Sequence, residues 1–273
     1  MKFDLRAEAL SRMMIVAHRG IAGGNIPCNT LEAYDAALCQ GADMIELDVS
    51  NAADGELFIF HPGMERIFLG LDKRLYELSS EEIRKLRFLN YDQVITDYPL
   101  MTLDEALEML KGRCYINIDK FWDNPEAICR VLRRHDMMDQ VLVKAPYSEN
   151  VVNALKEIAP EIPFMLVTKN EDPYSEMLQK SGIHYVGAEV LFKEEDAPVA
   201  SQEYIASMAA KKLIVWVNAI VYNYKTVLAA GHNDDISISG RADEGWGWLL
   251  DKGFHIIQTD FPLQLRHYMN GRK

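Results

Sequence analysis

Two histidines stand at the ends of short apolar runs, where a β-strand would finish. His18 follows the run Met13–Ala17, and His61 closes the run Glu56–His61. An imidazole titrates near pH 6.5, roughly, so a pair of them can act as base and acid at neutral pH. Arg19, beside His18, can hold a phosphate group through two parallel hydrogen bonds. The remaining histidines lack this context, and we expect structural roles for them: His135, His184, His232, His255 and His267.

A pair of carboxylates occupies one face of another predicted strand. Glu46 and Asp48 are two residues apart within Met44–Val49, and side chains alternate along a strand, so both point to the same side. Close carboxylates repel each other unless a cation lies between them, which favours a hard divalent ion, Mg²⁺ or Ca²⁺. Asp119, which ends a later run, can complete the site. A solvated edge pair is the alternative, and the nearby histidines weaken it.

Strands that could position these side chains recur along the chain. Apolar or β-branched runs alternate with amphipathic segments of helical length, which indicates βαβ units and a parallel sheet. Eight strand–helix units predict a (β/α)8 TIM barrel, whose active site lies at the C-terminal ends of the strands. The predicted strands are Met13–Ala17, Met44–Val49, Tyr115–Asp119, Val141–Lys144, Phe164–Thr168, Tyr185–Val190, Leu213–Asn218 and His255–Thr259.

Helix starts and one interruption complete the predicted organisation. Hydroxyl or amide side chains precede carboxylates in the segments that begin at Asn29, Ser79 and Thr102, as at helix N-termini. Residues 62–100 break the strand–helix alternation after an extra strand at Glu56–His61. We interpret them as an insertion with one short helix that caps the barrel mouth. The prediction is therefore a single domain over residues 1–273 with a small insertion.

Composition narrows the class of protein. With 49% apolar and 26% charged residues, the 273-residue chain can bury a sizeable core. The net charge of −12 argues against nucleic acid or an anionic membrane as the main partner, so a small anionic substrate needs a local cationic pocket. Four cysteines without C-x-x-C spacing suggest free thiols, and neither a signal peptide nor a membrane span is recognisable. We therefore expect a cytoplasmic protein without stable membrane insertion; its oligomeric state is left open.

Seven motifs in order resemble the glycerophosphodiester phosphodiesterase family over nearly the full chain. That family consists of barrel enzymes that hydrolyse glycerophosphodiesters to glycerol 3-phosphate and an alcohol. The resemblance implies that this chain binds a small glycerophosphodiester and a divalent cation. The matching segments are His18-Arg19-Gly20, Asn29-Thr30-Leu31-Glu32-Ala33, Glu46-Leu47-Asp48, Asp54-Gly55 leading to His61, Thr102-Leu103-Asp104-Glu105-Ala106, Asn117-Ile118-Asp119 and Thr259-Asp260-Phe261-Pro262.

Site roles follow from the resemblance position by position. It implies that His18 and His61 are the acid/base pair, that Glu46 and Asp48 bind the metal, and that Arg19 contacts phosphate. It also implies that Trp216 is a substrate-contacting aromatic at the barrel mouth. The expected reaction forms a cyclic phosphate first and then opens it with water, the histidines exchanging roles. Which histidine begins as the base is left open.

Three departures from the family pattern affect the site. Cys28 stands where the family usually has Glu before Asn-Thr, and Pro62 follows His61 where the family usually has Asp. The family commonly shows Glu-x-Lys on the third strand, whereas Lys120 directly follows Asp119 here. Strand alternation would point Lys120 outward if Asp119 points inward, although a twist at the strand end can bring it back, so Lys144 is a rival for the phosphate contact and both are retained as candidates.

Two other functions remain open from the sequence. The same barrel and histidines could serve a phosphodiesterase or lyase resembling phosphatidylinositol phospholipase C or the phospholipase D lyases. The missing carboxylates at Cys28 and Pro62 would also suit a catalytically silent protein that binds glycerophosphodiesters. Retention of both histidines and of the Glu46/Asp48 pair favours the enzyme.

Overall fold

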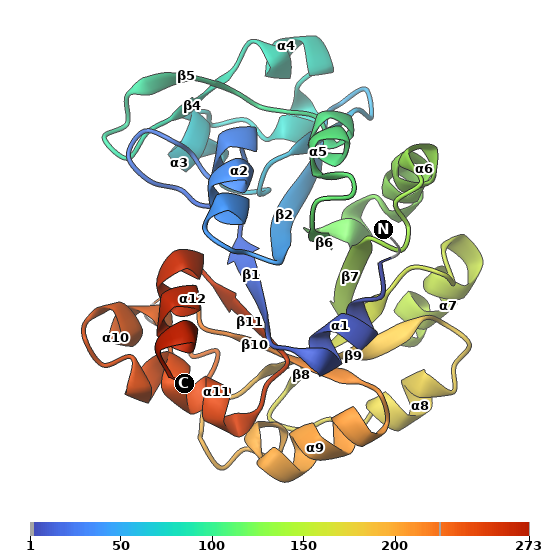
Figure 1. The fold of residues 1–273 in the computed structure, drawn as a ribbon. Helices are drawn as coiled ribbons and strands as arrows, with labels where there is room; N and C mark the ends of the chain where they lie inside the picture. Colours follow the sequence, from blue (N-terminus) through green and yellow to red (C-terminus); the bar gives the residue numbers. More distant parts are fainter. Residues whose placement is uncertain (1–2, 224, 273) are drawn as a thin grey trace.

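Eight parallel strands close into a barrel in the computed structural model, which describes residues 3–223 and 225–272 (Figure 1). The strands follow the order β1-β11-β10-β9-β8-β7-β6-β2, and pairing of β1 with β2 completes the ring. The predicted TIM barrel is confirmed, and every predicted strand overlaps an observed one. The barrel strands are β1 (Met14–His18), β2 (Met44–Asn51), β6 (Tyr115–Asp119), β7 (Val141–Pro146), β8 (Phe164–Lys169), β9 (Tyr185–Leu191), β10 (Ile214–Asn218) and β11 (Ile256–Thr259).

Helices surround this barrel, and several begin at the side chains that the sequence indicated. The hydroxyl groups of Thr30, Ser79 and Thr102 each accept a hydrogen bond from the backbone N–H three residues later. Within the described ranges, no helix is long and apolar enough to cross a membrane. The helices outside the insertion are α1 (Leu5–Ser11), α2 (Leu31–Cys39), α5 (Leu103–Leu110), α6 (Pro125–His135), α7 (Glu149–Ile158), α8 (Ser175–Gln179), α9 (Gln202–Ala210), α10 (Asp234–Ile238), α11 (Trp248–Lys252) and α12 (Pro262–Gly271).

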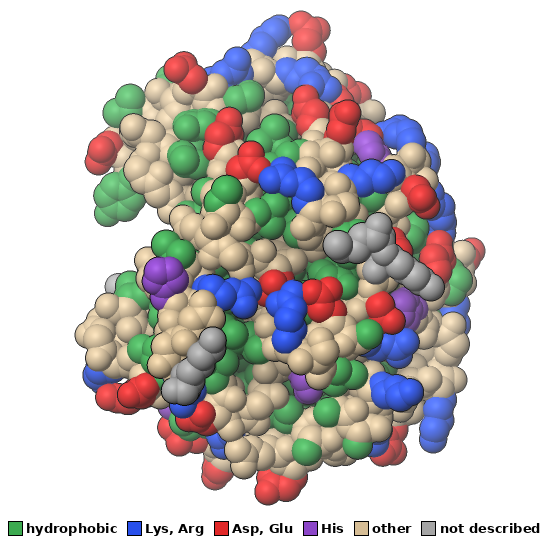
Figure 2. Space-filling view, in the orientation of Figure 1, with side chains coloured by type: hydrophobic (Ala, Val, Ile, Leu, Met, Phe, Trp, Pro, Cys, Tyr) green, Lys and Arg blue, Asp and Glu red, His purple; other side chains and the backbone are tan. Residues whose placement is uncertain are grey.

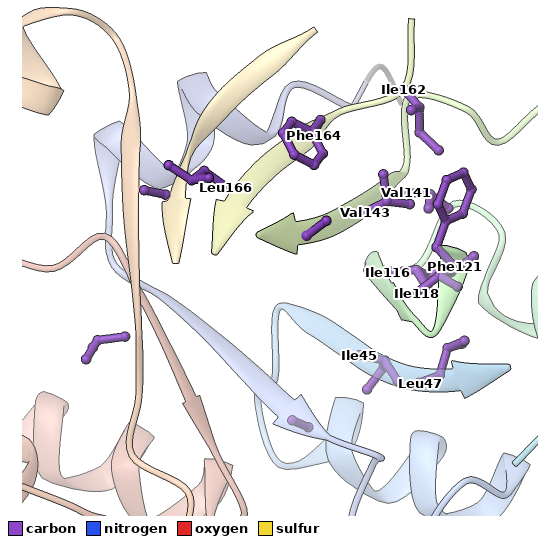
Figure 3. Packing of buried hydrophobic residues seen from close by; sticks show 14 of the residues in the cluster. Ile45, Leu47, Ile116, Ile118, Phe121, Val141, Val143, Ile162, Phe164 and Leu166 are labelled. Atoms are coloured by element: carbon purple, nitrogen blue, oxygen red, sulfur yellow. The ribbon is translucent and has the colours of Figure 1, made fainter. Parts of the chain in front are cut away.

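Strand alternation divides the barrel residues into an outer and an inner set. Outward-facing residues such as Ile45, Leu47, Ile116 and Ile118 are buried against the helices (Figure 3). The inward-facing residues near the strand starts are also apolar, and α1 closes this end with Leu5. Because apolar side chains fill the barrel at the N-terminal ends of the strands, the polar inward-facing residues are confined to the opposite, C-terminal end.

The segment after β2 is more regular than expected. β3 (Leu57–Ile59) pairs antiparallel with β2, and the insertion then holds two short α-helices, a 3₁₀ turn and a two-stranded sheet. Phe88 stacks on Phe60 within a separate apolar cluster, with ring centroids 6.1 Å apart. The insertion elements are α3 (Glu65–Leu69), the 3₁₀ turn Leu75–Glu77, α4 (Ser80–Arg84), β4 (Arg87–Leu89) and β5 (Ile95–Pro99).

The insertion does not cap the barrel mouth as the sequence suggested. None of residues 62–100 lines the cavity at the C-terminal ends of the strands. Residues of the insertion instead enclose a separate apolar pocket with the loop 22–28, and Asn90 Nδ2 donates to Asn25 Oδ1 at 2.9 Å. The apolar cluster around Phe88 explains this placement, because it anchors the insertion beside the barrel. Assignment of the whole chain to one domain stays a prediction.

A glycine at the β9–β10 contact offers a test of the barrel. Gly187 has a φ of +152°, and an added Cβ would lie 1.9 Å from the carbonyl oxygen of Ile214 on the neighbouring strand. We expect Gly187→Ala to lower the free energy of unfolding by about 1–3 kcal/mol or more, because the strands must separate. Gly271→Ala at the end of α12, where a Cβ meets nothing within 4 Å, should be near neutral. Urea unfolding of both variants checks this; equal stabilities would contradict it.

Candidate active site

A cavity of about 430 Å³ opens at the C-terminal ends of the barrel strands. Its wall combines charged and amide side chains on one part with apolar residues such as Val167 and Leu228 on another. Most of the polar residues predicted from the sequence meet here, although they come from separate strands. The charged and amide side chains of the wall include His18, Arg19, Glu46, His61, Asp119, Lys120, Lys144, Glu189, Asn218 and Gln258.

Three carboxylates converge beside the two histidines. Glu46, Asp48 and Asp119 each place one oxygen within 4.8 Å of those of the other two. Glu46 Oε2 accepts the backbone N–H of Arg19 at 3.0 Å, and Asp48 Oδ2 accepts Asn29 Nδ2 at 3.0 Å. These bonds fix both carboxylates, while Asp48 Oδ1 is buried with no hydrogen-bond partner among the described residues. A hard divalent cation suits such a group of oxygens.

The electrostatics of this cluster also favour a cation. Burial and then the charge of Asp48 raise the pKa of Glu46 to about 8. Burial of Asp119 would raise its pKa as well, but the adjacent Lys120 ammonium outweighs burial and lowers it. A bound divalent cation would favour the ionised form of Glu46 and satisfy the orphaned oxygen of Asp48. The residues present therefore fit a divalent metal site.

His18 ends β1 and has a carboxylate partner. Its Nδ1 lies 2.9 Å from Asp260 Oδ1, which follows β11 on the neighbouring strand. Burial alone would lower the pKa of His18, but the hydrogen bond to Asp260 and the charges of Glu46 and Asp260 outweigh burial and raise it. Because Asp260 engages Nδ1, the other ring nitrogen of His18 is left for chemistry in the cavity.

His61 lies after β3 and is oriented by the backbone instead. Its Nδ1 is 2.9 Å from the carbonyl oxygen of Pro62, so this oxygen fills the orienting role that a family carboxylate would have. His61 Nε2 lies 4.0 Å from Asp48 Oδ1. Burial lowers the pKa of His61, and the positive charges of Arg19 and Lys120 add to this against the charge of Asp48. The two imidazoles therefore have different partners and opposite pKa shifts.

Arg19 reaches the cluster through a sharp backbone turn. It has a left-handed φ of +57°, and the following Gly20 has a φ of +77° with no room for a Cβ against Ala33. This turn places Arg19 Nε 3.0 Å from Asp48 Oδ2, although the pair is not aligned as a hydrogen bond. The His-Arg-Gly order thus delivers an imidazole and a guanidinium to the same cavity.

Both candidate lysines line the cavity. Lys120 follows β6 with a left-handed φ of +60°, which returns its side chain to the site and pairs it with Asp119. Strand alternation had suggested an outward direction, and the left-handed turn is the reason for the difference. Lys144 Nζ lies 2.7 Å from Glu189 Oε2 and 3.9 Å from the ring centroid of Trp216.

Trp216 does not stand at the barrel mouth. Its side chain is fully buried inside the barrel, where it packs with the apolar residues at the N-terminal ends of the strands, and it does not line the cavity. The Lys144 ammonium packs over the face of its ring as a cation–π contact. The expectation of a direct substrate contact is therefore wrong, because β10 turns this side chain inward one layer beneath Asn218.

The profile of the glycerophosphoryl diester phosphodiesterase family matches residues 18–264 of this chain. The chain belongs to this family. It is thus a phosphoric diester hydrolase, and the predicted resemblance is confirmed.

Curated relatives agree with membership of the glycerophosphodiester phosphodiesterases. YhdW of Bacillus subtilis (strain 168) is 49% identical over 164 residues, which cover 58% of this chain and 66% of YhdW. The glycerophosphodiester phosphodiesterase of Bacillus altitudinis is 28% identical over 186 residues, which cover 62% of this chain and 74% of that protein.

Solved structures of glycerophosphodiester phosphodiesterases share the fold. An enzyme from Parabacteroides distasonis ATCC 8503 has a TM-score of 0.80 at 17% identity, covering 100% of this chain and 94% of that one. An Oleispira antarctica phosphodiesterase, in complex with the product sn-glycerol-3-phosphate, has a TM-score of 0.69 at 19% identity and covers 96% of this chain and 99% of that one.

Several residues of this glycerophosphodiester phosphodiesterase site had no role assigned from the sequence. Asp260 was visible as a polar residue after the last strand, but its pairing with His18 depends on barrel closure. Glu189 lies within β9 and Gln258 within β11, where nothing in the local sequence sets them apart. Cys28 is half-buried, and burial raises the pKa of its thiol to about 12, so it does not replace the missing family carboxylate by ionising.

The partner of His18 gives a prediction for the metal-free protein. The raised pKa of folded His18 contributes stability below its ordinary pKa, and this contribution is lost as pH rises through the folded value. Asp260→Asn should therefore lower the pKa of His18 and cost more stability at acidic than at alkaline pH. NMR titration of the His18 imidazole measures the pKa, and urea unfolding at one acidic and one alkaline pH measures the change in stability. Asp196→Asn, at an exposed position, is the control; an unchanged His18 titration in Asp260→Asn would contradict the pairing.

Proposed function

We propose that this chain hydrolyses glycerophosphodiesters to glycerol 3-phosphate and an alcohol, using a divalent cation and two histidines. The observation that carries the proposal is the convergence of three carboxylates, two imidazoles and three cationic side chains at one cavity. The product bound to the Oleispira antarctica phosphodiesterase supports the same substrate class.

Glu46, Asp48 and Asp119 would hold the cation, Mg²⁺ or Ca²⁺. When bound, the cation supplies positive charge that acidifies a nearby hydroxyl and offsets negative charge on phosphate. The guanidinium of Arg19 and the ammonium groups of Lys120 and Lys144 would bind the phosphate oxygens. Lys144 is held on one side of the cavity by Glu189, so its position does not depend on the metal ligands.

We assign the first base to His18 and the first acid to His61. A carboxylate on Nδ1 stabilises the imidazolium that forms when the other nitrogen accepts a proton, and only His18 of these two has such a partner among the described residues. The lowered pKa of His61 makes its protonated form the stronger acid. The charge of Asp48, 4.0 Å away, helps His61 to hold its proton until transfer.

The proposed reaction has two steps in which the histidines exchange roles. His18 accepts the proton of the central glycerol hydroxyl as its oxygen bonds to phosphorus. The bond from phosphorus to the alcohol breaks, and His61 gives its proton to the departing oxygen. Water then opens the cyclic phosphate, with His61 accepting the proton of water and His18 returning one to the glycerol oxygen. Phosphorus NMR of glycerophosphocholine turnover tests the proposal: glycerol 3-phosphate is expected, while accumulation of only cyclic phosphate indicates a lyase.

Metal dependence follows from the three carboxylates. EDTA should abolish turnover, and Mg²⁺ or Ca²⁺ should restore it. Asp48→Asn should weaken metal binding in calorimetric titration without unfolding the chain, because a near-isosteric change disturbs no apolar core. Asp72→Asn, at a side chain 88% exposed, should bind metal like the wild type. Full activity in protein verified as metal-free by elemental analysis would refute the metal assignment.

Removing either histidine should impair proton transfer. We expect His18→Ala and His61→Ala each to lower kcat by about 10²–10⁴-fold, the usual contribution of a positioned acid or base. A nitrophenyl glycerophosphodiester needs little protonation of its leaving group, so it should rescue His61→Ala and not His18→Ala. His267→Ala, at an exposed position on α12, should keep full activity. Rescue of His18→Ala instead would reverse the assigned roles.

A further inference from the structure

Gln258 presents an unusual buried amide to the cavity. The residue is 4% exposed and lines the cavity, yet its amide has no hydrogen-bond partner within residues 3–223 and 225–272. Other buried amides differ, because Asn29, Gln140 and Asn218 each have both amide atoms hydrogen-bonded. Asn117 keeps one unpartnered oxygen, but Asn117 does not line the cavity. The amide atoms of Gln258 are not fully enclosed by protein, so they face the cavity, where water or a ligand can hydrogen-bond to them.

The position of Gln258 relates it to one histidine. On β11 it pairs in register with Val16 of β1, two residues before His18. Val16 and His18 share a strand face, so Gln258 lies on the inner face next to the base. His61 follows β3, which adjoins β2 rather than β11. The free amide is therefore on the side of His18.

Neighbouring polar side chains on this side of the cavity are hydrogen-bonded or ion-paired with one another. Asn218 Nδ2 donates to Glu189 Oε1 at 2.6 Å, and Asn218 Oδ1 accepts Trp216 Nε1 at 3.0 Å. The second oxygen of Glu189 pairs with Lys144. This ring holds its members in place and contributes no free amide, so of the two amide side chains that line the cavity only Gln258 is left for a neutral ligand.

We propose that Gln258 recognises the terminal hydroxyl of the glycerol moiety, which makes it a determinant of specificity for glycerol over other vicinal alcohols. This inference rests on the proposed function, in which the central hydroxyl faces His18 and the leaving alcohol faces His61. The terminal hydroxyl, one carbon beyond the central one and away from the leaving group, then lies beside Gln258. A primary amide matches a hydroxyl because both donate and accept hydrogen bonds.

A substrate that lacks this hydroxyl provides the test. Glycerophosphocholine is compared with the choline phosphodiester of propane-1,2-diol, which keeps the central hydroxyl and replaces the terminal one by hydrogen. We expect the wild-type enzyme with Mg²⁺ to prefer the glycerol substrate in kcat/KM by about 10-fold, the order of one neutral hydrogen bond. Gln258→Met should lower kcat/KM for the glycerol substrate by a similar factor and leave the propanediol substrate unchanged, so the preference disappears.

Two further variants keep the test decisive. Gln258→Asn retains an amide but withdraws it from the cavity, so it should also lose the preference if Gln258→Met does not fold. Val167→Ala alters the apolar wall without a hydrogen-bonding group and should keep the wild-type ratio. An unchanged ratio in a folded Gln258 variant, or no preference in the wild type, overturns this inference alone. Absence of turnover of both substrates by the wild type overturns the proposed function as well.

Discussion

Repulsion between the buried carboxylates of Glu46 and Asp48 is the constraint around which the site is built. Placing two acids on one strand face inside a barrel is unfavourable unless opposite charge compensates them. Arg19 lies beside Asp48 and Lys120 beside Asp119, and each contributes positive charge. The side-chain amide of Asn29 also donates a hydrogen bond to Asp48 Oδ2. Burial still raises the pKa of Glu46 to about 8, so compensation is incomplete without a further cation. The need for that cation is the strongest physical reason to expect a metal here.

This compensation depends on two backbone turns at the C-terminal ends of barrel strands. Arg19 and Lys120 both adopt left-handed φ values directly after a strand, and each turn brings a cationic side chain back over the strand end. Left-handed backbone is unfavourable for such residues, by roughly 1 kcal/mol or more each. Ion pairing with Asp48 and Asp119 offsets this cost. The charged cluster and the two turns therefore stabilise each other. A change at one carboxylate should alter the backbone conformation of the loop that carries its cationic partner.

Sequence periodicity predicted the barrel because the outer faces of the strands are mostly apolar where they pack against the helices. The same periodicity predicted Glu46, Asp48, His18 and Asp119 at one end of the barrel. Contacts across the closing strands could not be predicted in this way. Asp260 meets His18 only because β11 lies next to β1, 242 residues away in sequence. Lys120 was retained as a candidate although alternation alone would point it outward, and its return to the site depends on a turn after β6. Trp216 was placed too near the barrel mouth, because its depth within β10 is not visible in the local sequence.

Charge distribution explains how an acidic chain can bind a phosphodiester. Acidic and basic side chains are interspersed over the face shown in Figure 2, and the net charge of −12 gives no long-range attraction for an anion. The attraction must therefore be local. Arg19 and Lys120 are paired with Asp48 and Asp119, which would hold the metal. A bound metal would compete for these carboxylates and leave the positive charge of both side chains available to phosphate. Lys144 is tied to Glu189 instead and keeps its place in either state. Metal and substrate binding should consequently be cooperative through Arg19 and Lys120, and more weakly so through Lys144, whose charge also lowers the pKa of Asp119.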